Sequence, residues 1–284
     1  MGYTAREIIV SKSNPLFVKL SKLLQKKYRE AEGLFMFDGE KLFSEACDSG
    51  LDLVMVIVDA DYIDRAEKAA FVTERLKKYT QNEVVLVTLG NSLVGKFTEE
   101  KAPQGIITVA KTIDFSEKYN KIYNNENFFD GSRKTLMLSN IRDPGNLGTI
   151  IRSAAAFEAD AVYVSKGCAD LFGAKVVRGS MGALFRQPIR LIEDEVAFIK
   201  ELKMLGVGVY AAALERNAKR LGEQSTDDKK NGECYVIGNE GEGLSREIIE
   251  SCSETVFIPM SEKAESLNAS VAASVILWEM YRGR

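Results

Sequence analysis

Residues 135–165 read TLMLSNIRDPGNLGTIIRSAAAFEADAVYVS, and this stretch decides the fold. It begins and ends with short, mostly apolar segments, 135–139 and 161–165, which are typical of strands buried on both faces of a sheet. Between them, segment 147–158 is rich in alanine and favours a helix. A strand, a helix and a second strand in this order indicate an α/β fold with a parallel sheet.

The same alternation continues on both sides of this stretch. Towards the N-terminus we expect strands at 33–38, 53–59, 84–88 and 105–110, helices at 39–49 and 63–79, and a helical turn at 93–98. Towards the C-terminus we expect strands at 208–214, 235–238 and 255–259, a short extended segment at 189–191, and helices at 174–184, 196–205 and 268–282. Asparagine and charge dominate the segment between the two halves, which has little periodicity and reads as a linker. We therefore predict a small α/β domain at 1–112, a linker at 113–134, and a parallel-sheet domain at 135–284.

The composition is that of a soluble globular protein without histidine chemistry. Of 284 residues, 45% are hydrophobic and 28% charged, and the net charge of −3 argues against a uniformly basic nucleic-acid coat. The absence of histidine excludes Ser-His-Asp and Cys-His catalysis and metal sites with His ligands. The cysteines are too widely spaced for a zinc knuckle or a Cys-x-x-Cys pair: Cys47, Cys168, Cys234 and Cys252. With no membrane span or signal region in the sequence, we expect a cytoplasmic protein with free thiols and no metal.

The first 29 residues are strongly basic, with seven lysines and arginines against the single acid Glu7. Leucines recur at helical spacing in 16–24, and Asn14-Pro15 is a helix-start signal. The pattern predicts a basic amphipathic helix, which either contacts RNA phosphates or is simply a solvated helix face.

Three clusters follow predicted strands, at the edge where ligands bind in open α/β sheets. In the first, 140–152, an Asp-Pro-Gly turn precedes Asn146, which is placed to cap a helix, and Arg152 lies among small apolar residues. Such an arginine is either functional or a surface charge whose stem covers apolar neighbours.

The second cluster, 237–245, reads IGNEGEGLS. Its glycines suit close backbone approach to a ligand that is not strongly anionic, because Glu240 and Glu242 repel phosphate and no P-loop lysine follows. The third combines IPM at 258–260 with ESLNASVAA at 265–273. There we expect Ser266 to cap the last helix and Asn268 to lie in its first turn. Each cluster alone also reads as ordinary structure, a tight turn or a capped buried helix.

In this order, the three clusters resemble the motifs of the SpoU (TrmH-like) family of RNA ribose 2′-O-methyltransferases, in the SPOUT superfamily. The matching residues are Asn146 and Arg152, GNEGEGLS at 238–245, and IPM with ESLNASVAA between 258 and 273. The N-terminal part resembles the ribosomal-protein-like substrate-binding domain of many relatives, through SKSNPLFVKLSKL, GLFMFDGEKLFSEA and APQGIITVA. Together, the two resemblances cover nearly the whole chain.

This resemblance implies a deep trefoil knot in the C-terminal sheet and a site for S-adenosylmethionine formed largely by backbone groups. The implied cofactor-binding residues are Gly238, Asn239, Ile258, Met260 and Leu267. The residues implied in the chemistry are Asn146, Arg152, Glu240, Ser266 and Asn268. The predicted RNA-binding residues are Lys19, Lys22, Lys26, Lys27 and Arg178.

The resemblance also implies how the chemistry and the assembly work. In the family proposal, Arg152 activates the ribose 2′-hydroxyl. Because arginine is a poor free base, we expect it instead to stabilise the developing alkoxide and to contact the neighbouring phosphate. A homodimer is implied as well, formed through the first-motif helix and the last helix, whose apolar side includes Val275, Ile276 and Trp278.

Two positions depart from the family pattern. Glu262 stands where glycine is usual, and Met181 where a small residue is expected. The change at Glu262 bears on cofactor affinity. Neither position replaces one of the implied catalytic residues, so we still expect an active enzyme.

Three alternatives remain open at this stage. One is a non-catalytic RNA-binding paralogue, which tight binding of S-adenosylmethionine would argue against. Another is a nucleotide-dependent enzyme with a Rossmann-type site, but its glycine loop should follow the first strand of the domain, whereas here it comes late. The third is a transfer RNA substrate; the auxiliary N-terminal domain favours ribosomal RNA by analogy.

Overall fold

The computed structural model describes residues 8–98, 100, 102–123, 133–224, 231–239, 241–261 and 266–283. The chain forms two compact units. The first contains Met1–Ile113 and Asp170–Arg186, and the second contains Asp114–Ala169 and Gln187–Arg284. Segment Asp170–Arg186 thus packs with the N-terminal residues, although it lies in the C-terminal half of the sequence. Among the described residues, no helix has the length and apolar character needed to cross a membrane.

The first unit is built on a four-stranded sheet with the order β1-β4-β2-β3. Its strands are β1 (Leu34–Asp38), β2 (Leu53–Asp59), β3 (Val85–Leu89) and β4 (Ile106–Lys111). β4 is antiparallel to both β1 and β2, whereas β2 and β3 are parallel. β1 and β4 are buried along most of their length, which requires cover on both faces of the sheet.

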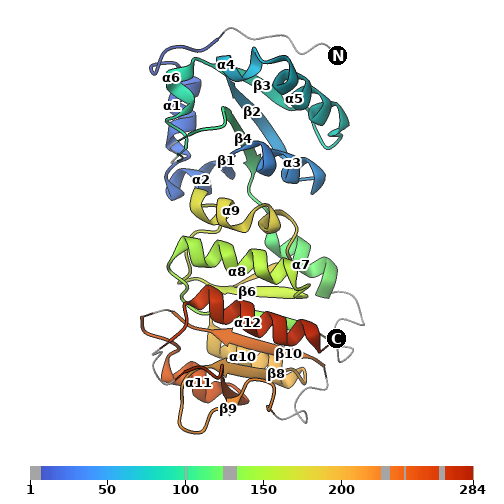
Figure 1. Ribbon diagram of the computed structural model, residues 1–284, viewed down its shortest axis with the longest axis vertical. Helices are drawn as coiled ribbons and strands as arrows, with labels where there is room; N and C mark the ends of the chain where they lie inside the picture. The colour runs from blue at the N-terminus through green and yellow to red at the C-terminus, as the bar shows by residue number, and fades with distance from the viewer. Residues whose placement is uncertain are drawn as a thin grey trace. The chain divides into compact units, whose positions relative to one another are not determined.

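Helices supply this cover (Figure 1). They are α1 (Pro15–Lys22), α2 (Lys26–Glu32), α3 (Glu40–Asp48), α4 (Ala60–Ile63), α5 (Ala66–Lys78) and α6 (Asn91–Val94). On one side, apolar residues of α1 and α6 share a core with Met36, Ile57 and Val109 of the sheet. On the other side lie α3 and α5, whose Phe43 and Phe71 rings meet edge to face with centroids 5.9 Å apart.

Segment Asp170–Arg186 completes the first unit with α9 (Ala174–Ser180) and the 3-10 helix η1 (Ala183–Phe185). The rings of Phe172 and Phe185 pack on Phe35 of β1, with centroids 4.8 and 6.4 Å away. Arg29 of α2, which is buried, donates a hydrogen bond to the carboxylate of Asp170. An aromatic cluster and a largely buried ion pair therefore hold this segment in place.

The second unit is built on a seven-stranded sheet with the order β7-β6-β5-β10-β8-β11-β9, in which every neighbouring pair is parallel. Its strands are β5 (Lys134–Leu138), β6 (Ala161–Ser165), β7 (Ile189–Ile192), β8 (Gly208–Ala212), β9 (Lys219–Arg220), β10 (Glu233–Ile237) and β11 (Glu254–Phe257). The predicted α/β fold with a parallel sheet is confirmed. β5 and β10, far apart in the sequence, lie side by side in the middle of the sheet.

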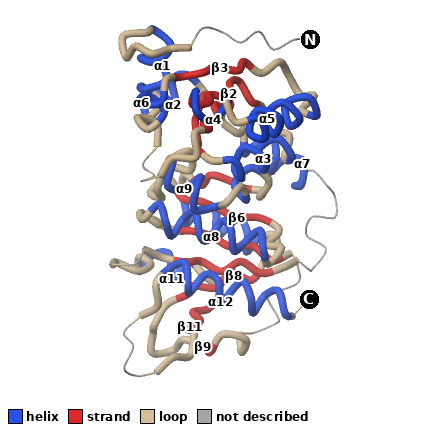
Figure 2. The backbone as a smooth tube through the Cα atoms, turned by 45° about the horizontal axis from the view of Figure 1, so that its top comes forward, coloured by secondary structure: helices blue, strands red, loops and turns tan. Residues whose placement is uncertain are grey.

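Helices cover both faces of this sheet as well. They are α7 (Phe115–Tyr123), α8 (Pro144–Ala156), α10 (Glu195–Met204), α11 (Arg246–Ser251) and α12 (Ala269–Arg282). α8 and α12 pack together on the near face in Figure 1, and α10 lies behind the strands. Phe198 and Leu202 of α10 share a buried core with Tyr163 and Val236 of the sheet. Figure 2 shows the helices in blue and the strands in red.

The structure differs from the sequence predictions at several helix ends and connections. α7 lies within the segment that reads as a linker. Asp143, not Asn146, caps α8, because Pro144 starts the helix and the Asp143 carboxylate accepts from the backbone N–H of Asn146 at 2.7 Å. Asn268, not Ser266, caps α12. Met181 ends α9 in the left-handed region, with φ 50°.

Candidate functional site

A cavity of about 240 Å³ lies at the carboxyl edge of the parallel sheet in the second unit. Segments that follow β8, β10 and β11 line it, together with the start of α12. None of the described residues that line it is charged, so it offers apolar surface and backbone groups. The cavity borders three neighbouring strand ends of a parallel sheet, where α/β proteins bind their ligands.

All five residues predicted to bind a cofactor line this one cavity: Gly238, Asn239, Ile258, Met260 and Leu267. Ser266, predicted for the chemistry, lines it as well. Sequence analysis missed Ala212, the last residue of β8, and Ala213 and Leu214, which follow it. The available signal was their position at the end of a predicted strand on the same edge.

The side chain of Asn239 organises the loop after β10. Its Oδ1 accepts from the backbone N–H groups of Gly241 at 2.9 Å and Glu242 at 3.2 Å. Its Nδ2 donates to the carbonyl oxygen of Asn140 at 2.9 Å. Both ends of the amide are engaged, so Asn239 holds the loop in shape and leaves contact with a ligand to the loop backbone.

The glycines of this loop are required by close packing and by backbone conformation. A Cβ atom on Gly238 would lie 2.5 Å from the carbonyl carbon of Gly243, well inside contact distance. Gly243 has φ 66°, in the left-handed region, and its N–H donates to the carbonyl oxygen of Asn239 at 2.9 Å. The loop therefore folds tightly on itself at the mouth of the cavity.

Asn140 is a further site residue that sequence analysis did not single out. Its φ is 56°, its N–H donates to the hydroxyl of Ser165 at 3.0 Å, and its carbonyl accepts from Asn239. A Cβ atom on Gly167 would lie 1.7 Å from the Asn140 Oδ1, so this approach needs glycine. Asn140 thus connects the ends of β5, β6 and β10. Asparagine tolerates the left-handed region, but nothing in a single sequence marks where it adopts it.

Side-chain hydrogen bonds join α8 to α12. Asn268 Nδ2 donates to Asn146 Oδ1 at 3.0 Å, while Asn268 Oδ1 accepts from the backbone N–H of Ser270 at 2.9 Å. Further along the helices, the hydroxyls of Ser153 and Ser274 share a hydrogen bond of 2.9 Å. The structure thus brings together Asn146 and Asn268, two predicted site residues that are 122 positions apart in the sequence.

Arg152 lies on the exposed side of α8, one residue before Ser153. The two inter-helix bonds fix the helix that carries it. No described residue forms an ion pair with its guanidinium, so its positive charge is available to an anionic ligand. This placement fits the role predicted for Arg152.

Two residues singled out in the sequence, Glu240 and Glu262, lie outside the described residues. Within the described ranges, no group of three or more Cys, Asp or Glu side chains could hold a metal ion. Cys168, close to Ile141, has its thiol pKa raised by burial, so it is protonated at neutral pH and is a poor nucleophile. Within the described part of the site, the available chemistry is hydrogen bonding and electrostatic stabilisation.

The lysines predicted to bind RNA lie on α1 and α2 of the first unit. Lys19 and Lys26 pair with exposed glutamates at 2.9 and 3.7 Å, contacts that contribute little to stability in water. The ammonium groups of Lys22 and Lys27 lie 5.6 and 4.8 Å from the centroid of the Tyr28 ring. All four side chains are exposed and able to reach a phosphate.

Arg178, the fifth predicted RNA contact, is placed differently. Its guanidinium pairs with the carboxylates of Asp38 and Glu100, each at 3.0 Å. Two acidic partners offset its charge, and both lie in the first unit. Arg178 therefore ties α9 to the end of β1.

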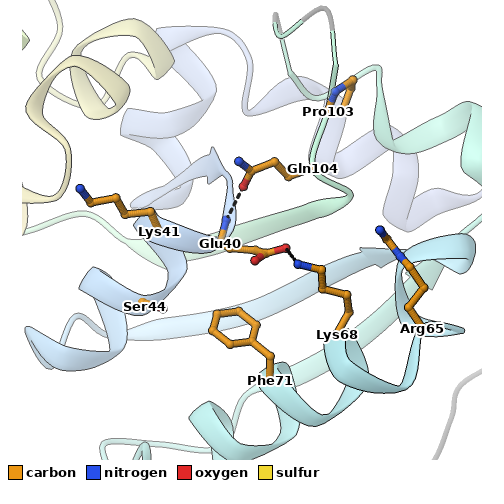
Figure 3. A pocket seen from close by; sticks show the side chains of 8 residues that line it. All are labelled: Glu40, Lys41, Ser44, Arg65, Lys68, Phe71, Pro103 and Gln104. Atoms are coloured by element: carbon orange, nitrogen blue, oxygen red, sulfur yellow. Dashed lines mark hydrogen bonds and ion pairs between the residues drawn. The ribbon is translucent and has the colours of Figure 1, made fainter.

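A second cavity, of about 650 Å³, lies in the first unit between the starts of α3 and α5 and the loop before β4 (Figure 3). The carboxylate of Glu40 pairs with Lys68 at 2.7 Å, and the backbone N–H of Glu40 donates to Gln104 Oε1 at 2.8 Å. Lys41 and Arg65 also line this cavity. Sequence analysis did not single out this group, because its members come from three separate segments.

Comparison with known proteins agrees with this geometry. Residues 133–278 match the family model described as the SpoU rRNA Methylase family, and residues 14–108 match the MRM3-like substrate binding domain. Together with the parallel sheet and its uncharged cavity, the first match defines the class of the protein as an α/β RNA methyltransferase. The chain belongs to the SpoU rRNA methylase family.

Individual relatives are similar over most of the chain. The 23S rRNA (guanosine(2553)-2′-O)-methyltransferase RlmP of Bacillus subtilis is 28% identical over 96% of this chain and 98% of its own length. The mitochondrial rRNA methyltransferase 3A of Danio rerio is 27% identical over 89% of this chain and 64% of its own length. The crystal structure of AdoMet-bound rRNA methyltransferase from Sinorhizobium meliloti superposes with a TM-score of 0.79 at 26% identity, over 98% of both chains.

Proposed function

We propose that this protein transfers a methyl group from S-adenosylmethionine to the 2′-oxygen of a ribose in ribosomal RNA. The uncharged cavity at the carboxyl edge of the sheet, next to the Asn146–Asn268 pair, is the observation that carries this proposal. The family, the Bacillus subtilis relative and the AdoMet-bound relative all support it.

The residues of the cavity fit this cofactor. An adenosine presents apolar faces and hydrogen-bonding edges, which backbone N–H and carbonyl groups satisfy without charged side chains. In this proposal, Gly238, Ile258 and Met260 hold it by backbone and apolar contacts, and Leu267, just before α12, closes the cavity. When bound, S-adenosylmethionine supplies an activated methyl group on a sulfonium sulfur.

The chain's own residues orient and activate the ribose. With the cofactor bound, its methyl group would pass from the sulfonium sulfur to the 2′-oxygen, and the hydroxyl proton would pass to water. Arg152 stabilises the negative charge that develops on this oxygen and binds the neighbouring phosphate. Asn146, held by Asn268, positions the ribose, and Ser266 adds a hydrogen-bonding group beside the cavity. The family resemblance assigns Glu240 to the chemistry as well. Correct orientation alone contributes roughly 7–11 kcal/mol to such reactions.

The first unit binds the RNA in this proposal. Its match to a substrate binding domain and the exposed lysines of α1 and α2 support this role. Ribosomal RNA and free thiols are both typical of the cytoplasm, where we place the protein.

A deep trefoil knot and a homodimer are also part of the proposal. The insertion of β10 between β5 and β8, both of which precede it in the chain, is the topological support for a knot. Exposed apolar side chains on α12, namely Val271, Trp278 and Tyr281, support the dimer. Ile276, predicted for the same surface, is 0% exposed and belongs to the protein's own core.

Methylation with tritium-labelled S-adenosylmethionine tests the activity. Transcripts of 23S rRNA and a pool of transfer RNA transcripts are offered separately, and the labelled RNA is digested to nucleosides. We expect label in a 2′-O-methylnucleoside from the 23S transcript. Label on a base, or on transfer RNA alone, would contradict the proposal.

A further inference from the structure

We infer that the cavity between α3 and α5 binds one unstacked nucleotide of the RNA, with cations holding its phosphate and Phe71 stacking on its base. This inference rests on the proposed function. It adds a contact separate from the lysines of α1 and α2, which lie on the other side of the four-stranded sheet (Figure 1).

The charge of the cavity favours an anion. Three cations, Lys41, Arg65 and Lys68, line it against one carboxylate, Glu40. Because Glu40 pairs with Lys68 at 2.7 Å, it offsets one charge. No described residue forms an ion pair with Lys41 or Arg65, so about two positive charges remain for a ligand.

Two of these cations, Arg65 and Lys68, are held near the same aromatic ring. The Arg65 guanidinium and the Lys68 ammonium lie 5.5 and 5.9 Å from the centroid of the same Tyr62 ring. Tyr62 is 1% exposed and gives both groups a fixed platform. Like charges held near one another repel, and a phosphate between them relieves this repulsion.

The rest of the cavity fits a base. Phe71 is half-buried, and an edge-to-face contact with the buried Phe43 holds its ring in place. Every base has a face that stacks on an aromatic ring, and RNA-binding proteins commonly use this contact for unpaired nucleotides. Figure 3 shows the Phe71 ring beside the Lys68 side chain and facing Glu40.

Gln104 supplies a directed hydrogen-bond donor. Its Oε1 accepts from the backbone N–H of Glu40 at 2.8 Å. This bond fixes the carboxamide and leaves its amide nitrogen for another partner. Gly39 permits this approach with φ 105°; a Cβ there would lie 3.2 Å from the same oxygen. No described residue accepts from Gln104 Nε2, so this group is able to donate to a carbonyl oxygen or ring nitrogen of a base.

The volume agrees with this occupant. The cavity measures about 650 Å³, within the range of about 300–1,000 Å³ typical of small-ligand sites. A nucleotide in a duplex keeps its base stacked and paired, so the site selects a loop or a single strand.

The test is filter binding of RNA by full-length variants over a range of salt concentrations. Lys41→Gln/Arg65→Gln removes the two unpaired cations, and Lys77→Gln/Lys78→Gln removes two exposed cations from the far end of α5 as a matched control. Phe71→Leu keeps an apolar side chain against Phe43 and removes the stacking face. The probes are a 23S rRNA transcript and pooled transfer RNA, and binding of S-adenosylmethionine is measured in parallel.

We expect Lys41→Gln/Arg65→Gln to weaken RNA binding and to reduce the slope of log K against log salt by roughly 0.7 for each lost phosphate contact. We expect Phe71→Leu to weaken binding about tenfold with an unchanged slope. The control should match wild type, and cofactor affinity should stay the same throughout.

Equal losses from the cavity and control pairs would show a general charge effect and overturn the inference. Unchanged RNA binding by Lys41→Gln/Arg65→Gln would also overturn the inference. A thermal-shift assay with millimolar AMP then tells what the cavity binds: if AMP raises the melting temperature of wild type but not of this variant, the cavity binds a free nucleotide instead of RNA. If ribosomal RNA is not the substrate, wild type should bind the transfer RNA pool more tightly than the 23S transcript. The affinity of each variant relative to wild type still tests the cavity in that case, so the two failures are distinguishable.

Discussion

Arg152 is the only charged residue of α8, and its place in a helix fixed at two points to α12 makes it the residue on which catalysis should depend most. We predict that Arg152→Ala lowers the methylation rate about 10²–10³-fold, because it removes the charge that stabilises the developing alkoxide. Single-turnover assays with saturating RNA and cofactor measure this rate.

Cofactor affinity provides the control for this prediction. Arg152 does not line the cofactor cavity, so calorimetry should give nearly the wild-type dissociation constant for S-adenosylmethionine. Arg152→Lys should recover only part of the rate, since lysine keeps the charge but lacks the planar fork that binds two oxygens. A normal rate for Arg152→Ala would show that the active site has been assigned wrongly.

Asn239 makes a different kind of contribution, through the shape of the cofactor loop. Asn239→Asp keeps an acceptor for Gly241 and Glu242 but loses the donor to the Asn140 carbonyl and places a charge beside it. We predict about tenfold weaker binding of S-adenosylmethionine, the scale expected from one lost hydrogen bond. Calorimetry measures the affinity, and unchanged RNA binding is the control; wild-type cofactor affinity would exclude a positioning role for Asn239.

Glu195, at the start of α10, gives a prediction about pH. Burial raises the pKa of its carboxyl, although a hydrogen bond with Ser139 acts in the opposite direction. The folded state thus binds the proton more tightly than the unfolded state, so the contribution of Glu195 to stability is present at low pH and is lost as pH rises through its folded pKa. We predict that Glu195→Gln raises the melting temperature relative to wild type at pH 8, and that this gain shrinks towards pH 4.

The exposed Glu193 supplies a control for this pH dependence. Glu193→Gln removes a carboxylate that is 78% exposed, so it should change the melting temperature little at either pH. If Glu195→Gln gives the same gain at pH 4 and pH 8, titration of Glu195 is not its source.

At the scale of single residues, the sequence singled out candidate residues but not the contacts that they make. Asn146 and Asn268 each stood out in a cluster, but their hydrogen bond depends on how two helices 122 residues apart meet. Both helix caps were predicted two or three positions away from the true cap, because Asp143, Asn146, Ser266 and Asn268 are all good cap residues and only geometry selects among them.

At the scale of elements, most strands were predictable because each is a run of apolar residues that contrasts with the residues on either side of it. α7 was missed because asparagine and charge hide its apolar spacing, and burial of Tyr119 against Tyr163 and Arg190 is what identifies it as a packed helix. α11 and β9, with six and two residues, are too short to show a period.

The basic helices α1 and α2 lead to a prediction about RNA affinity. We expect Lys19, Lys22, Lys26 and Lys27, replaced together by glutamine, to weaken RNA binding and to reduce the salt slope by roughly 0.7–0.9 for each lost phosphate contact. The ion pairs of Lys19 and Lys26 are exposed and weak enough for a phosphate to displace them. Filter binding at several salt concentrations measures both quantities, and the single-turnover rate on bound RNA should change little. Wild-type affinity and slope would show that these helices do not anchor the RNA.

At the scale of the whole molecule, strand order was beyond the reach of local patterns. Nothing in the segment 233–237 shows that β10 inserts between β5 and β8, because all three strands are apolar and equally able to pair. The packing of Asp170–Arg186 with the first unit was equally hidden. It depends on Phe172 and Phe185 meeting Phe35, a contact between residues more than a hundred positions apart.

At the same scale, the exposed face of α12 leads us to predict that the protein forms a homodimer. Trp278 is 50% exposed and Val271 is 47% exposed, and they lie seven residues apart on one side of the helix. The ring of Phe157, which caps the end of α8, packs against Trp278 with centroids 5.8 Å apart. A two-fold interface would bury this apolar patch twice. We therefore expect light scattering at micromolar concentration to give twice the chain mass of 31.5 kDa.

Charge placed in this patch should separate the subunits, because an unpaired carboxylate at a buried interface is strongly unfavourable. Val271→Glu/Trp278→Glu should scatter as a monomer, whereas Met204→Glu, at an 83% exposed position on α10, should stay dimeric. The residues proposed to hold the cofactor all belong to this chain, so we expect the monomeric variant still to bind S-adenosylmethionine. A wild-type protein that is monomeric under these conditions would show that the patch on α12 serves another purpose.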